Sequence, residues 1–175
     1  DFGYWEHTGE GRNFLNRVNL LANLKNIPIY FLDGNHDKTS LLLEMYDVIS
    51  DGDREGFLLV REYVRYARRG LTWIWGDTPS GWIEFIALGG AYSVDKQWRL
   101  ELEAKRDQPE SLWFPEEEMT DEEMNEILDQ RHTRSVDVML AHDKPRSSVP
   151  NWNRKDFPEC LPNQDRLQAA VQALR

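Results

Sequence analysis

Cysteine is almost missing from this sequence, since Cys160 is the single one among 175 residues. One cysteine excludes an intrachain disulfide and a cysteine-based zinc cage, and it favours a reducing compartment, so we expect a cytoplasmic protein. Long apolar runs are missing as well, because none approaches the roughly 18 residues that a membrane-spanning helix needs. We therefore expect no integral membrane segment.

Basic residues are scarce compared with acidic ones. The chain has 21 Lys+Arg and 31 Asp+Glu, and 21 − 31 gives a formal net charge of −10. This balance disfavours the basic groove that duplex nucleic acid needs. It leaves room for a local anion site, because a bound metal ion can reverse the sign of the charge locally.

The chain does contain enough apolar material for one core. Hydrophobic residues make up 40% of it, and the aromatic residues include 7 Trp, 6 Tyr and 7 Phe. A single core usually organises on the order of 100 to 200 residues. We therefore expect one domain over residues 1–175.

The spacing of the apolar residues alternates between helical and strand periods, which predicts an α/β fold. Helices are expected over residues 13–25, from a cap at Thr39 or Ser40 through residue 46, within the acidic run 115–129 as an exposed helix with a capping box at Thr120 and Glu123, and from a cap at Asn163 onward. The alternating charges of residues 97–108 predict a solvated helix or loop. Strands are expected at residues 27–32, 57–60, 63–66, 71–75, 82–88 and 136–140, with the middle four forming a β meander.

The tetrapeptide Gly34-Asn35-His36-Asp37 directly follows the apolar strand predicted at residues 27–32. Ligands of open α/β sheets gather beyond the carboxyl ends of the strands, so an amide oxygen and an imidazole at this place can meet a metal ion and a phosphate. The alternative is an ordinary strand-ending turn, because Gly, Asn and Asp are turn formers. The pattern favours the metal and phosphate site.

At this tetrapeptide the chain resembles the calcineurin-like metallophosphoesterases, whose loops carry D-x-H, G-D-x-x-D, G-N-H-D/E, a lone His after a strand, and G-H-x-H. Residues 1–4 (DFGY) are similar to the second loop without its Gly, and residues 138–145 (VMLAHDKP) are similar to the loop with the lone His. The resemblance implies Asp1, Asn35 and His142 as ligands of two divalent metal ions, which could be Mn, Fe, Zn, Ni or Co.

The resemblance also implies a fold and an activity. The fold would be a four-layer αββα sandwich of two β-sheets flanked by helices, incomplete in this stretch. The activity would be hydrolysis of phosphate mono- or diesters by a metal-bound water, with a small phosphate ester or a nucleotide as substrate. His36 would be the general acid, a role that suits an imidazole pKa near 6.5.

Two departures from the family pattern matter. Tyr4 stands where the second loop has its second Asp, so the carboxylate that orients His36 would be missing or supplied by Asp37. The D-x-H and G-H-x-H loops are absent, so we expect truncation at both ends, part of a metal cage, weak metal binding and little activity. Two alternatives stay open: an inactive protein-binding scaffold of the same fold, and a nuclease of the same superfamily.

A second motif, residues 89–96 (GGAYSVDK) with Arg99 after it, resembles a stretch of small bacterial and phage members of the superfamily. Lys96 or Arg99 could bind a substrate phosphate there, although a surface salt bridge is the more expected role of either side chain. Asp143, next to His142, would either hydrogen-bond a ligand histidine or belong to a solvated turn.

Overall fold

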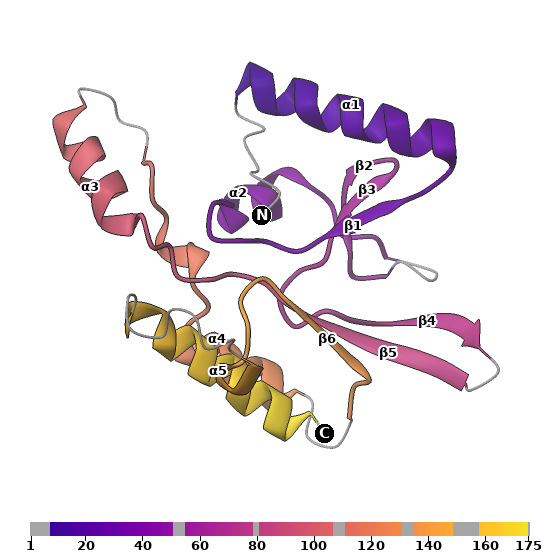
Figure 1. The fold of residues 1–175 in the computed structure, drawn as a ribbon. Helices are drawn as coiled ribbons and strands as arrows, with labels where there is room; N and C mark the ends of the chain where they lie inside the picture. Colours follow the sequence, from indigo (N-terminus) through magenta and orange to yellow (C-terminus); the bar gives the residue numbers. More distant parts are fainter. Residues whose placement is uncertain are drawn as a thin grey trace.

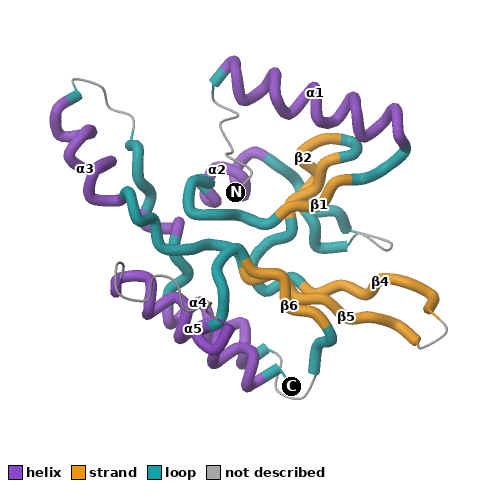
Figure 2. Tube along the Cα trace, in the orientation of Figure 1, coloured by secondary structure: helices purple, strands orange, loops and turns teal. Residues whose placement is uncertain are grey.

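The computed structural model of the chain describes residues 8–50, 55–78, 81–106, 111–130, 135–148 and 158–174. Within these residues the fold is mixed α/β, with two three-stranded sheets and five α-helices (Figure 1, Figure 2). The α-helices are α1 (Gly9–Lys25), α2 (Thr39–Met45), α3 (Lys96–Lys105), α4 (Asp121–Asp129) and α5 (Leu161–Ala173). The strands are β1 (Ile29–Phe31), β2 (Leu58–Arg61), β3 (Val64–Tyr66), β4 (Thr72–Thr78), β5 (Gly81–Leu88) and β6 (Val138–Ala141). Among the described residues, no helix is both long and apolar enough to cross a membrane.

The six strands form two mixed sheets. The first has the order β1-β3-β2, with β1 parallel and β2 antiparallel to β3. The second has the order β4-β5-β6, with β4 antiparallel and β6 parallel to β5. The expected β meander is therefore wrong, because its four strands form two hairpins in different sheets. The chain leaves the first sheet after β3 and turns at Gly70, which has a φ of 78°.

Three buried hydrophobic clusters lie between neighbouring layers, because alternate side chains of a strand point to opposite faces of its sheet. On β5, Ile86 and Leu88 pack against α4 and α5, whereas Phe85 and Ala87 pack toward the first sheet. A further cluster joins α1 and α2 to the other face of the first sheet. The order of layers is thus helices, sheet, sheet, helices, as Figure 1 shows.

Helix α1 starts earlier than its apolar spacing predicts, at Gly9, and it ends at Lys25 as expected. The Thr8 hydroxyl accepts a hydrogen bond from the Gly11 N–H at 2.9 Å, which caps the first turn and offsets the low helix propensity of glycine there. Asn26 ends the helix in the left-handed conformation, with a φ of 52°. The chain therefore turns before Pro28, and the strand begins at Ile29.

The caps expected for α2 are wrong. Lys38 occupies the N-cap position of α2 and makes no side-chain capping bond. Thr39 is buried inside the first turn, and the Ser40 hydroxyl instead donates to Oε1 of Glu116 at 2.6 Å. The Ser40 hydroxyl, which local spacing assigns to the helix cap, thus binds a residue far along the chain instead.

The cap of α4 is confirmed and that of α5 is wrong. The Thr120 hydroxyl accepts from the Glu123 N–H at 3.1 Å, as expected for an N-cap. In α5 the N-cap residue is Cys160, and Asn163 lies inside the helix. Its side-chain amide donates to Oδ2 of Asp143 at 3.0 Å, which ties the helix to the loop after β6.

Gly89 follows β5 and packs directly on the loop after β1. We expect Gly89→Ala to lower the free energy of unfolding by about 1–3 kcal/mol, because the added Cβ would overlap the Asp33 carboxylate and lie 2.9 Å from its carbonyl oxygen. Urea denaturation measures the change. Gly9→Ala is the control, since nothing lies within 4 Å of its added Cβ. Equal stability of the two variants would contradict the expectation.

Candidate functional site

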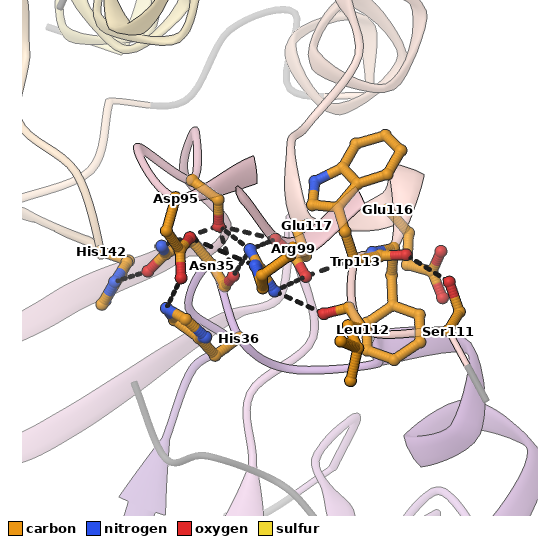
Figure 3. A network of polar contacts seen from close by, with 12 residues as sticks. Asn35, His36, Asp95, Arg99, Ser111, Leu112, Trp113, Glu116, Glu117 and His142 are labelled. Atoms are coloured by element: carbon orange, nitrogen blue, oxygen red, sulfur yellow. Dashed lines mark hydrogen bonds and ion pairs between the residues drawn. The ribbon is translucent and has the colours of Figure 1, made fainter. Parts of the chain in front are cut away.

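Three loops meet at the carboxyl ends of β1, β5 and β6. They bring together Asn35, Ser93 and His142, as Figure 3 shows for Asn35 and His142. Oδ1 of Asn35 lies 3.1 Å from Nε2 of His142, although the two residues are 107 positions apart in the sequence. The expected proximity of Asn35 and His142 is therefore confirmed. Asp1, the third expected ligand, lies outside the described residues.

Asp37 closes the turn that carries Asn35 and His36. It is fully buried, and its Oδ2 accepts a hydrogen bond from the Gly34 N–H at 2.8 Å. An aspartate that accepts from a backbone N–H three residues earlier shapes the loop directly. This contact holds the turn that carries Asn35 and His36.

The carboxylate that faces His36 belongs to Asp95. Its Oδ2 lies 3.9 Å from Nε2 of His36, and each side chain keeps 34% of its surface exposed (Figure 3). Sequence reasoning did not single out Asp95, although it noted the stretch 89–96 that contains it. Tyr4, which stands where the family has an Asp for this role, lies outside the described residues.

Asp33 anchors the base of the same loop. It is fully buried, and its carboxylate accepts from the Tyr66 hydroxyl at 2.8 Å and from Nε of Arg69 at 2.8 Å. Burial, together with the Asp33 carboxylate, raises the pKa of Tyr66 well above its ordinary value, so the phenol stays a donor. The Asp33 carbonyl accepts from the Gly90 N–H at 2.9 Å, which joins the loops after β1 and β5.

Sequence reasoning assigned no role to Asp33 or Arg69. The sequence did offer one sign for Asp33, which is its position immediately after an apolar strand. A carboxylate at the end of a buried strand is itself buried unless the chain turns away from the sheet at that residue. For Arg69 no local signal exists, because its partners come from distant segments of the chain.

Arg99 forms a buried ion pair with Glu117. Nη2 of Arg99 lies 2.6 Å from Oε2 of Glu117, and Nη1 lies 2.8 Å from Oε1, so both ends of the guanidinium fork are engaged. The side chains are 5% and 0% exposed. The salt bridge expected at Arg99 is thus present but is buried instead of lying at the surface. The guanidinium faces the protein, which does not suit direct contact with a substrate phosphate.

Glu117 lies in the acidic run that the sequence places on an exposed helix. The structure divides this run into a 3₁₀ turn over Pro115–Glu117 and helix α4, and it buries Glu117 while α4 keeps acidic residues outside. The helix expected in this run is confirmed from its Thr120 cap onward, and the exposure expected of the run is wrong at Glu117. Three consecutive glutamates give no local sign of which one turns inward.

Lys96 is engaged by an aromatic ring. Its Nζ lies 3.9 Å from the centroid of the Trp113 ring, within the range of a cation–π interaction. Residues 96 and 99 sit on the first turn of α3, one partly exposed and the other buried. A role of Lys96 in binding a phosphate stays a prediction.

His142 sits where a neutral imidazole is favoured. Burial lowers its pKa below the ordinary histidine value, and the nearby carboxylates of Asp37, Asp33 and Asp143 act against this shift. Asp143 itself accepts from the Lys144 N–H at 2.7 Å, so it is part of a hydrogen-bonded turn. A neutral imidazole nitrogen is the form that binds a metal ion.

The described residues include no group of three or more His, Cys, Asp or Glu side chains able to hold a metal ion. What they offer at the loop junction is one amide oxygen, on Asn35, and one imidazole nitrogen, on His142. The two atoms converge, and both are common metal donors, so this pair fits part of a coordination sphere.

A cavity of about 520 Å³ lies away from this junction, between α2, the β3–β4 connection and α4. None of Asn35, His36 and His142 lines it. Its walls carry both signs of charge, including Arg68 and Glu126, so no single ligand chemistry is singled out there.

Comparisons with protein-family models, with curated proteins and with solved structures return no match to this chain. The family resemblance stays a prediction based on the motifs quoted above.

Proposed function

We propose that this protein is a metal-dependent hydrolase of phosphate mono- or diesters, with the fold of the calcineurin-like metallophosphoesterases. The observation that carries the proposal is the 3.1 Å contact between Oδ1 of Asn35 and Nε2 of His142. The two residues come from separate motifs, and they meet at the edge of the sheets where ligands of α/β folds collect.

The layered architecture supports the proposed fold. Helices α1 and α2 cover the first sheet, α4 and α5 cover the second, and the sheets pack on each other through the Phe57 and Trp73 cluster. This order of layers is the one that the family resemblance implies. The parallel pair β5–β6 brings the loops after these two strands, which carry Ser93 and His142, to the same edge of the second sheet.

In the proposed site, Asn35 and His142 hold a divalent ion, and an oxygen and nitrogen donor set suits Mn, Fe, Zn, Ni or Co. Such an ion supplies a Lewis acid for the phosphate and lowers the pKa of a water molecule. His36, adjacent to Asn35 and one-third exposed, is the residue placed to give a proton to the leaving oxygen. Asp95 faces the ring of His36 and is the carboxylate placed to orient it.

Metal binding is the direct test. In the ¹⁵N-labelled chain, Mn²⁺ is expected to broaden the amide signals of residues 34–37 and 141–143 before those of α1. His142→Ala is expected to abolish this selective broadening, because it removes the imidazole whose Nε2 contacts Oδ1 of Asn35. His36→Ala is the matched control and is expected to keep it. Uniform broadening, or broadening unchanged by His142→Ala, would contradict the proposed ligands.

Activity is measured on the same proteins. Hydrolysis of bis(p-nitrophenyl) phosphate should depend on added Mn²⁺ and should fall with His142→Ala in parallel with the loss of broadening. Selective binding of Mn²⁺ without any turnover would support the alternative, an inactive scaffold of the same fold.

A further inference from the structure

Ser93 lies at the centre of the buried contacts behind Asn35. It is fully buried, and its hydroxyl oxygen lies 2.9 Å from Nδ2 of Asn35, 2.7 Å from the Asn35 carbonyl oxygen and 2.7 Å from Oε2 of Glu117. Nη2 of Arg99 also donates to this hydroxyl oxygen. One hydroxyl group thus contacts two donors and two acceptors.

The number of protons and lone pairs on the Ser93 hydroxyl determines which of these groups it donates to and which it accepts from. A serine hydroxyl has one proton to give and two lone pairs to accept with. The NH₂ group of Asn35 and the guanidinium of Arg99 can only donate, so they occupy both lone pairs. The one proton goes to the Glu117 carboxylate or to the Asn35 carbonyl, and the bond to a charged carboxylate is the stronger.

No proton of Ser93 is therefore left for the side-chain oxygen of Asn35. If the amide group of Asn35 were rotated by 180°, its Oδ1 would face a hydroxyl oxygen that has nothing to donate. The rotation would also place Nδ2, which cannot bind a metal ion, toward His142. In the observed orientation Nδ2 of Asn35 donates to the Ser93 hydroxyl oxygen, and Oδ1 faces Nε2 of His142, which donates to it in the Nε2–H tautomer.

We propose that Ser93 is a positioning residue whose hydroxyl, with its proton held by Glu117 and a lone pair filled by Arg99, makes Asn35 present oxygen to the metal site. The proposal rests on the proposed function for the identity of the ligand, but the orientation of the amide is a property of the metal-free protein. Arg99 adds a second contact, because its Nη2 lies 3.3 Å from the Asn35 carbonyl.

This role gives a reason for a buried ion pair at this place. Replacing a buried ion pair with apolar residues is often neutral or stabilising, so the Arg99–Glu117 pair is weak evidence for stability. It does determine the donor and acceptor pattern of Ser93, which apolar side chains could not do. Its effect reaches the site through the Asn35 amide.

Ser93→Ala tests the proposal, because it removes the acceptor of the Asn35 amide and leaves the Arg99–Glu117 pair in place. In the metal-free ¹⁵N-labelled protein, the two Nδ2 protons of Asn35 are expected to exchange slowly with water in the unmodified chain and quickly in Ser93→Ala. Ser111→Ala is the matched control, since that exposed hydroxyl donates to the Trp113 carbonyl, and it is expected to change nothing at Asn35.

Mn²⁺ titration supplies the second readout. Residues that orient a ligand typically change metal affinity by about 10–100-fold, and we expect a loss of that size in Ser93→Ala. In an Asn35→Asp background the loss should nearly vanish, because a carboxylate presents an oxygen in either orientation. Glu117→Gln is the second variant, because its amide can donate to Ser93 and release the hydroxyl proton, and the same exchange of the Asn35 protons is expected to accelerate.

Two results would overturn the positioning role. One is unchanged exchange of the Asn35 Nδ2 protons in Ser93→Ala. The other is an equal loss of Mn²⁺ affinity from Ser93→Ala in the unmodified chain and in the Asn35→Asp background, which would mean that Ser93 acts only on the structure. If the unmodified chain binds no Mn²⁺, the proposed function fails, and the exchange rates in the metal-free protein decide the orientation by themselves.

Discussion

Replacing His36 with alanine is expected to slow the Mn²⁺-dependent hydrolysis of an alkyl phosphate ester by about 10²–10⁴-fold, the usual loss for a positioned general acid. The hydrolysis of a p-nitrophenyl ester is expected to slow far less. An alkoxide leaves poorly without a proton, whereas p-nitrophenolate is stable enough to leave without one. The side chain of His36 is accessible to a substrate and lies beside Asn35, so it is placed to protonate the leaving oxygen of an ester bound at the proposed metal site.

The quantity to measure is the ratio of kcat/KM for the two esters in His36→Ala compared with the unmodified protein. A ratio is informative even when absolute turnover is slow. His142→Ala is the matched control and should depress both esters together, because it acts on metal binding. Equal losses on both esters in His36→Ala, together with lower Mn²⁺ content, would mean that His36 is a ligand or a structural residue.

Replacing Arg69 with methionine is expected to lower the free energy of unfolding by about 3–5 kcal/mol, the usual effect of leaving a buried charge without its partner. Arg69 is 7% exposed, and its Nη2 lies 2.7 Å from Oδ2 of the fully buried Asp33. The same guanidinium donates to Oε2 of Glu123 at 3.0 Å and to the Glu116 carbonyl at 2.6 Å. One side chain thus connects the loop after β1 to α4 and to the turn before it.

Arg68→Met is the matched control, because Arg68 is only partly buried and its Nε donates to the Gly56 carbonyl at 3.1 Å. Its loss should be about 1 kcal/mol, the size of an ordinary hydrogen bond. Adding Asp33→Asn to Arg69→Met should recover part of the stability, because it removes the unpaired carboxylate. Chemical denaturation measures all of these variants. Similar losses for Arg68→Met and Arg69→Met would contradict the importance assigned to the buried pair.

Much of the candidate site could be read from local sequence. The tetrapeptide at residues 34–37 and the histidine after the last strand were both identified there, and the structure brings Asn35 and His142 into contact. The supporting role of Ser93, Arg99 and Glu117 was not predicted, although Arg99 and the stretch that contains Ser93 were noted. That role depends on the contacts of these three side chains with one another. Nothing near Glu117 in the sequence separates it from the glutamates on either side.

Local sequence patterns were enough to predict the order of helices and strands and the place of the GNHD turn, because apolar periodicity, capping hydroxyls and turn-forming residues act over a few residues. Thr120 caps α4 for such a local reason. The tertiary fold alone places β2–β3 and β4–β5 in different sheets. It also decided that Arg99 and Glu117 turn inward, because strand pairing and the burial of charge depend on groups far apart in the chain.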